Sequence, residues 1–116
     1  MILAIVGTRT FSNYELFERI VEESYDIDLI SEIISGGATG ADTLAEIFAN
    51  KFSIKLTVYK PDWDLYGKKA GYIRNKLIIE NASNCIAFWD NISKGTKLSI
   101  DIANQLKKPL IVIKID

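Results

Sequence analysis

The chain begins with the apolar run Ile2-Leu3-Ala4-Ile5-Val6, and Gly7-Thr8-Arg9 follows it directly. A continuous run of this length is typical of a strand buried on both faces of a sheet. A second such run lies at Cys85–Trp89. Strands of this kind belong to parallel sheets that helices cover on both sides, so the two runs indicate the centre of an α/β fold.

Shorter apolar segments alternate with amphipathic helical segments along the rest of the chain. Further strands are predicted at Ile30–Ser35, Ile54–Tyr59 and Leu110–Ile115. Four helices are predicted: one from Ser12-Asn13-Tyr14-Glu15, which has capping-box spacing, one after the glycine cluster, and two at about Lys68–Asn81 and Thr96–Leu106. The apolar spacing assigns buried faces to the last two helices, with Ala70, Ile73 and Leu77 on one and Leu98, Ile102 and Leu106 on the other.

Strands and helices that alternate at this spacing are joined by right-handed crossovers and form a mostly parallel sheet. Ile54–Tyr59 alternates between apolar and polar residues, which is typical of a half-exposed edge strand. We therefore predict a three-layer α/β/α sandwich with a five-stranded parallel sheet in the order 3-2-1-4-5, within a single domain over residues 1–116. Ligands of such sheets bind outside the carboxyl ends of the strands, near the topological switch between the first and fourth strands.

The composition narrows the function classes. The 116 residues are 48% hydrophobic, and 14 Lys and Arg side chains stand against 15 Asp and Glu, for a net charge of −1. This balance argues against a domain that coats a DNA or RNA backbone, so nucleic acid is not the expected partner. The chain has no histidine, which excludes His triads, His general bases and His zinc sites.

The single cysteine, Cys85, cannot form an intramolecular disulfide, which fits a reducing compartment. The run Ile2–Val6 is too short to span a membrane and has no basic segment ahead of it, so we expect a cytoplasmic protein. Without histidine, only hard oxygen ligands remain for a metal, and an ion held by them would resemble Mg²⁺. The candidate carboxylates are Asp42, Asp62, Asp64 and Asp90.

Glycines and polar residues follow each strand that ends near the predicted switch. The segments are Gly7-Thr8-Arg9, Ser35-Gly36-Gly37-Ala38-Thr39-Gly40-Ala41-Asp42, Pro61-Asp62-Trp63 and Trp89-Asp90-Asn91-Ile92-Ser93-Lys94-Gly95-Thr96. Glycines let a backbone approach an anion, and a helix N-terminus offers unpaired N–H groups to it. These turns predict a cradle for phosphate. Each feature also has a structural interpretation, because a Gly-Gly pair often forms only a tight turn and aromatic residues often only pack.

Two familiar phosphate motifs are absent. The segment after the first strand does not read G-x-G-x-x-G, and Lys94-Gly95-Thr96 has the wrong order for a P-loop. A typical NAD dehydrogenase or Walker-type ATPase is therefore disfavoured.

In order along the chain, these turns, together with Gly67, Ala70-Gly71-x-x-Arg74-Asn75 and Ala87-Phe88-Trp89-Asp90, resemble the YspA-type branch of the SLOG superfamily. The resemblance extends from the first strand to the start of the fourth helix. The superfamily also includes the Lonely Guy phosphoribohydrolases and the Rossmann-like domain of the DNA-processing protein DprA. The resemblance implies a Rossmann-like nucleotide-binding fold.

The resemblance also implies roles for individual residues. Backbone N–H groups of the Gly36–Gly40 turn would contact phosphate, Ser93–Thr96 would bind a second phosphate or a sugar oxygen, and Asn75 would contact base or ribose. Arg9 and Arg74 would neutralise charge, because guanidinium suits bidentate phosphate recognition. Trp63, Tyr66 and Trp89 would stack on a base. The predicted ligand-binding set is Gly7, Thr8, Arg9, Ser35, Gly36, Gly37, Ala38, Thr39, Gly40, Asp42, Trp63, Tyr66, Arg74, Asn75, Trp89, Asp90, Ser93, Lys94, Gly95 and Thr96.

The sequence departs from the phosphoribohydrolases at one position. Their motif P-G-G-x-G-T-x-x-E ends on a catalytic glutamate, and Ser99 stands at the matching position here. A carboxylate would stabilise the oxocarbenium-like state of N-glycosidic cleavage. Asp42 and Asp90 are the candidates to replace the missing catalytic carboxylate. Each also suits a structural role, Asp42 as a cap of the second helix and Asp90 as a cap or brace of the turn that follows it.

We therefore predict a protein that binds a nucleotide or nucleotide derivative as a sensor or sequestering module. The alternative is a nucleotide-processing hydrolase, of the N-glycosidase or phosphoribohydrolase type, that uses Asp42 or Asp90. A third interpretation, a nucleic-acid partner domain by analogy with DprA, is disfavoured by the net charge. The resemblance further implies a homo-oligomer, a dimer or larger.

Overall fold

A computed structural model of the chain describes residues 1–115. The elements, in chain order, are β1 (Ile2–Gly7), α1 (Tyr14–Ser24), η1 (Ile27–Leu29), β2 (Glu32–Ser35), α2 (Ala41–Lys51), β3 (Lys55–Val58), α3 (Trp63–Tyr66), η2 (Gly67–Lys69), α4 (Ala70–Glu80), β4 (Asn84–Trp89), α5 (Lys94–Gln105) and β5 (Leu110–Lys114).

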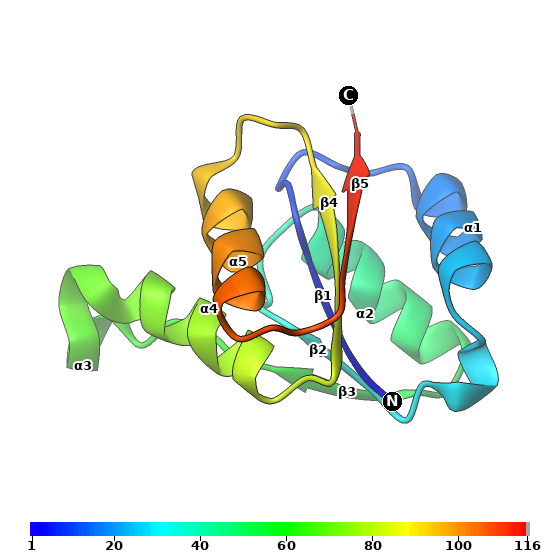
Figure 1. Cartoon of the computed structure of the whole chain (residues 1–116), viewed down its shortest axis with the longest axis horizontal. Coiled ribbons are helices and arrows are strands. Elements are labelled where there is room, and N and C mark those ends of the chain that lie inside the picture. The colour runs from blue at the N-terminus through cyan, green and yellow to red at the C-terminus, as the bar shows by residue number, and fades with distance from the viewer. Residues whose placement is uncertain (116) are drawn as a thin grey trace.

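The five strands form one parallel sheet in the order β3-β2-β1-β4-β5, which confirms the predicted Rossmann-like topology. The central strands β1 and β4 pair from Leu3 opposite Asn84 to Gly7 opposite Phe88. Both are the continuous apolar runs of the sequence. Figure 1 shows α1 and α2 on one side of the sheet and α4 and α5 on the other.

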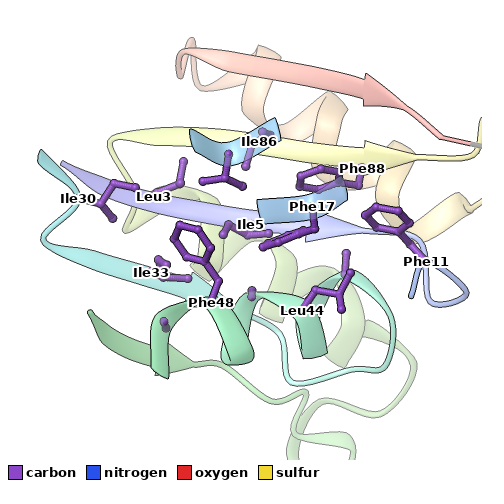
Figure 2. Packing of buried hydrophobic residues seen from close by; sticks show 14 of the residues in the cluster. Leu3, Ile5, Phe11, Phe17, Ile30, Ile33, Leu44, Phe48, Ile86 and Phe88 are labelled. Carbon is purple, nitrogen blue, oxygen red and sulfur yellow. The ribbon is translucent and has the colours of Figure 1, made fainter. Parts of the chain in front are cut away.

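Each face of the sheet has its own core because the side chains of β1 alternate between the faces. Leu3 and Ile5 belong to the cluster under α1 and α2, and Ala4 and Val6 to the cluster under α4 and α5. The first cluster is aromatic: the ring of Phe17 lies 4.9 Å from Phe88 and 6.0 Å from Phe48, between centroids (Figure 2). The second cluster is built of smaller residues.

The region from residue 60 to 80 differs from the prediction. The predicted connection at Lys60–Gly67 contains the short helix α3, and the predicted helix begins only at Ala70. Gly67 ends α3 with a positive φ of 57°, so α4 is a separate helix with its own orientation. Ile78 and Ile79 are buried on α4, whereas Leu77 is 40% exposed, so its predicted burial is wrong.

Smaller differences concern helix ends. Asn13, rather than Ser12, caps α1 by accepting a hydrogen bond from the N–H of Leu16. The last helix begins at Lys94, two residues before the prediction, because Ser93 caps it. Leu106 is exposed since it follows the helix as its C-cap, and Ile100 and Ala103 are buried instead. Within residues 1–115, no helix is long and apolar enough to cross a membrane.

Candidate functional site

The loops that follow β1, β2, β3 and β4 meet at the carboxyl edge of the sheet, where they form two connected hollows. The inner pocket has a volume of about 70 Å³ and the outer groove about 600 Å³. Arg9, Gly36, Ala38 and Arg74 line both, so the two hollows are continuous. The inner pocket is also lined by Val6, Gly7, Asp42, Asn75, Ile78, Ser93, Gly95, Thr96 and Ser99, and the outer groove by Gly37, Thr39, Lys60, Pro61 and Trp63.

Two glycines of the β2–α2 loop allow close packing that other residues would block. A Cβ on Gly36 would lie 2.5 Å from Nη1 of Arg74. Gly40 has a φ of 75°, and a Cβ there would collide with the backbone of Thr8 and Arg9. The glycine cluster therefore brings the β1–α1 loop and α4 against the same turn, and this contact places Arg9 and Arg74 at one hollow.

Thr8 holds three loops together from a buried position. Its N–H donates to the carbonyl of Phe88 at 2.9 Å, and its own carbonyl accepts from the N–H of Ala41 at 3.2 Å. Its hydroxyl accepts from the N–H of Asp90 at 3.1 Å. Thr8 lines neither hollow, so in this structure it positions the loops around the site.

Asp42 braces the glycine loop from within the inner pocket. It is only 8% exposed, and its Oδ2 accepts a hydrogen bond from the N–H of Ala38 at 3.0 Å. Burial raises the pKa of this carboxyl, although the hydrogen bonds from Ala38 and Gly36 and the charge of Arg74 oppose the rise. The predicted capping role is wrong, because Gly40 is the N-cap of α2 and the helix has no side-chain cap.

The guanidinium of Arg74 is held in place at the wall of both hollows. Its Nη1 donates to the carbonyl of Gly36 and its Nε to Oδ1 of Asn75, both at 2.7 Å. Burial lowers the pKa of Arg74, and the charge of Arg9 lowers it further, while Asp42 raises it. Two guanidinium groups that repel each other across a hollow favour the binding of an anion between them.

The N-terminus of α5 closes the inner pocket. The Oγ of Ser93 accepts from the N–H of Thr96 at 3.3 Å. Asp90 accepts from the N–H groups of Ile92 and Ser93, both at 2.8 Å, and these bonds lower the pKa of its carboxyl. Asp90 thus has the predicted bracing contact and does not line either hollow.

Several predicted ligand-binding residues lie outside both hollows. The indole N–H of Trp89 donates to the carbonyl of Ser93 at 3.0 Å, and its ring packs against the second core cluster. Ser35 is fully buried, and its hydroxyl has no hydrogen-bond partner among the described residues. The predicted residues that line neither hollow are Thr8, Ser35, Gly40, Tyr66, Trp89, Asp90 and Lys94.

Sequence reasoning missed Lys60, which contributes the third cation of the outer groove. Its only signal was its place directly after an edge strand, at the carboxyl edge where the other loops meet. No motif contains it.

The carboxylates proposed for Mg²⁺ do not form a metal centre. Residues 1–115 contain no group of three or more His, Cys, Asp or Glu side chains arranged around one point. Asp42 and Asp90 accept from backbone N–H groups, and Asp62 caps α3 by accepting from the N–H of Leu65 at 3.1 Å. Each of these three carboxylates is therefore engaged by backbone N–H groups in this structure.

This fold and this pair of hollows define the class of protein. The chain belongs to the YspA, cpYpsA-related SLOG family, whose model matches residues 1–66. It is 28% identical over 114 residues to the gene 61 protein of Mycobacterium phage D29, covering 92% of this chain and 91% of that one.

A solved structure with the same fold is that of DNA processing protein A from Helicobacter pylori, described for its unique single-stranded DNA binding mode. The TM-score is 0.74 at 22% identity, and the match covers all of this chain and 66% of that one. The match therefore supports the fold, and this chain spans just under two thirds of that protein.

This comparison corrects the predicted function and partner. We predicted a small-nucleotide sensor or sequestering protein, or a nucleotide hydrolase, and considered nucleic acid an improbable partner. Both predictions are contradicted, because a protein of this fold binds single-stranded DNA. The net charge misled the prediction since it averages separate regions. Six acidic residues lie on or beside α1 and η1: Glu15, Glu18, Glu22, Glu23, Asp26 and Asp28. Three cations meet at the outer groove: Arg9, Lys60 and Arg74.

Proposed function

We propose that the chain binds single-stranded DNA through its phosphate backbone, at the carboxyl edge of the sheet. One observation carries the proposal: Arg9, Lys60 and Arg74 come from three different parts of the fold and line one groove of about 600 Å³. Among the described residues, no acidic side chain lines that groove. The shared fold with a protein that binds single-stranded DNA supports the same function.

The dimensions of the two hollows suit a strand that lies along the outer groove and reaches into the inner pocket. Pockets that enclose a small molecule have roughly 300–1,000 Å³. The inner pocket, at about 70 Å³, has room for little more than a phosphate-sized group, and only the wider outer groove reaches that range. A backbone that runs along the outer groove would therefore present one phosphate to the inner pocket.

The cations suit this task in different ways. Arg74 is already oriented by Gly36 and Asn75, so binding costs it little side-chain entropy. Arg9 and Lys60 are exposed and free to follow successive phosphates. Guanidinium groups bind phosphate with two parallel hydrogen bonds, whereas the lysine acts as a point charge.

The test is the salt dependence of binding to a fluorescein-labelled strand of twenty thymidines, followed by fluorescence anisotropy. Each phosphate contact to a single strand contributes about −0.7 to the slope of log K against log salt. Arg9→Ala should weaken binding about tenfold and reduce the slope by about 0.7. Lys114→Ala is the matched control, because Lys114 is an exposed cation at the same edge of the sheet but outside both hollows.

Binding that is undetectable at low salt would overturn the proposal. Equal losses in Arg9→Ala and Lys114→Ala would also overturn it, because the strand would then respond to total charge and not to this groove.

A further inference from the structure

A short segment beside the outer groove projects from the molecule. We call it the arm; it comprises Asp62–Lys69, that is, α3 and η2 with the residue that caps α3. Every residue of the arm is exposed. Figure 1 shows α3 lying away from the sheet, beyond α4. An exposed segment that still has regular helical structure must be held by local contacts.

Those contacts hold the helical turn that carries Trp63. Asp62 accepts from the N–H of Leu65 with its side chain at 3.1 Å and from the N–H of Tyr66 with its carbonyl at 3.0 Å. The edge of the Trp63 ring faces Gly71 of α4, where a Cβ would lie 3.7 Å from Cη2 of the indole. Trp63 remains 58% exposed beside this neighbour.

Trp63 lines the outer groove together with Arg9, Lys60 and Arg74. The groove thus places an exposed aromatic ring beside three cations. The arm itself carries Lys68 and Lys69 against Asp62 and Asp64, so its own charge is balanced and the excess of cations lies in the groove. This pattern, an aromatic face next to a cationic track, fits a single strand whose bases point away from its backbone.

We propose that the arm is a base-stacking platform, in which Trp63 stacks on an unpaired base of a strand whose phosphates lie along Arg9, Lys60 and Arg74. This inference rests on the proposed function and adds a reason for the protein to select single strands over duplexes. A base inside a duplex is stacked on both faces and cannot offer a face to Trp63. The arm therefore makes the protein select single strands over duplexes, with little preference among the four bases.

The test compares a thymidine strand with a strand of the same length made of abasic sites. Both carry the same phosphates, and only the first carries bases. The native protein should bind the thymidine strand about 5- to 150-fold more tightly, the range expected for one stacked base. Trp63→Ala should abolish most of this ratio, and Trp63→Phe should keep most of it.

Tyr72→Ala is the matched control. Tyr72 is also an aromatic residue, 46% exposed on α4, and it lines neither hollow. Its removal should leave the ratio unchanged, and a ratio that falls equally in both alanine variants would overturn the inference.

The possible results separate the two proposals. Equal affinity of the native protein for both strands would overturn base stacking and leave backbone binding intact. Failure to bind either strand would overturn the proposed function itself. The arm also offers Leu65 and Tyr66 as exposed apolar surface for a second copy of the chain. If Trp63→Ala lowers the mass in sedimentation and leaves the binding ratio unchanged, the arm is a self-association surface and the inference is wrong.

Discussion

Two grooves of similar size lie at the carboxyl edge of the same sheet. The outer groove, on the side of α4, has about 600 Å³, and a second groove beside α1 has about 460 Å³. We call the second one the α1-side groove; its lining is Thr10, Phe11, Ser12, Asn13, Leu16, Ile20, Lys114 and Ile115. The outer groove contains three cations and the α1-side groove one. Position and size are therefore common to both, and charge distinguishes them.

The two grooves also differ in how they are built. Gly36 lets the side chain of Arg74 approach the outer groove, and Gly40 lets the loop that carries Arg9 pack against the same turn. In the α1-side groove, Phe11 supplies the wall and stacks on Phe88 at 5.4 Å between centroids. One hollow thus presents polar backbone and guanidinium, and the other an apolar wall next to the acidic helix α1. This comparison suggests that only the first is suited to an anionic strand.

The largest expected effect comes from breaking the contact that assembles the outer groove. Gly40→Ala would place a Cβ against the backbone of Thr8 and Arg9 at a positive φ. We expect a loss of about 2–4 kcal/mol in the free energy of unfolding, measured in urea, because overpacking and backbone strain add.

Gly95→Ala is the control for that substitution. A Cβ at Gly95 meets nothing within 4 Å, and the residue lies in the first turn of α5. Its unfolding free energy should be unchanged or rise by up to about 1 kcal/mol. Similar losses in both variants would show that the close approach at Gly40 does not hold the loops together.

Charge reversal compares the two grooves directly. Lys60→Glu should weaken binding to the thymidine strand more than tenfold, because it places a carboxylate among the phosphates. Lys114→Glu, in the α1-side groove, should change the affinity by less than about twofold at the same salt concentration, since Lys114 is exposed and lines neither the outer groove nor the inner pocket, and salt screens exposed charges that make no direct contact. Anisotropy titrations of both variants provide the measurement. A larger loss of affinity in Lys114→Glu than in Lys60→Glu would place the strand in the α1-side groove and contradict the account.

The smallest effect concerns the two carboxylates of the site, which should have opposite pH signatures. Burial raises the pKa of Asp42 above its ordinary 3.8, so its bound proton stabilises the fold at low pH, and this contribution is lost as pH rises through the raised pKa. Hydrogen bonds from Ser93 and Ile92 lower the pKa of Asp90, so its contribution is present above 3.8 and is lost as pH falls through the lowered pKa.

Urea unfolding of both asparagine variants between pH 3 and 6 tests these signs. Relative to the native protein, Asp42→Asn should gain stability as the pH rises and Asp90→Asn should lose it. Shifts in the same direction would show that the two carboxylates share one environment.

The predictable parts of this molecule are those that depend on pattern. The continuous apolar runs Ile2–Val6 and Cys85–Trp89 and the alternating edge strand were enough for the strand order. The glycine turns and Arg9 also lie at the predicted edge, because parallel strands present their carboxyl ends together. Here the local sequence determines the position of each residue.

The remaining features depend on tertiary contacts that leave no local pattern. The burial of Ile78 in place of Leu77 follows from how α4 packs after Gly67. Asp42 bonds to the glycine loop, and nothing in its sequence position separates this from a helix cap. Net charge gave the wrong partner because it says nothing of where Arg9, Lys60 and Arg74 meet.

The most direct measurement of the central claim is a titration of the isotope-labelled protein with the thymidine strand, followed by the chemical shifts of its backbone amides. The account predicts shifts at Gly36–Thr39, Trp63 and Ser93–Thr96, with small changes at Leu16, Ile20 and Lys114. Shifts concentrated in the α1-side groove, or spread evenly over the chain, would contradict it.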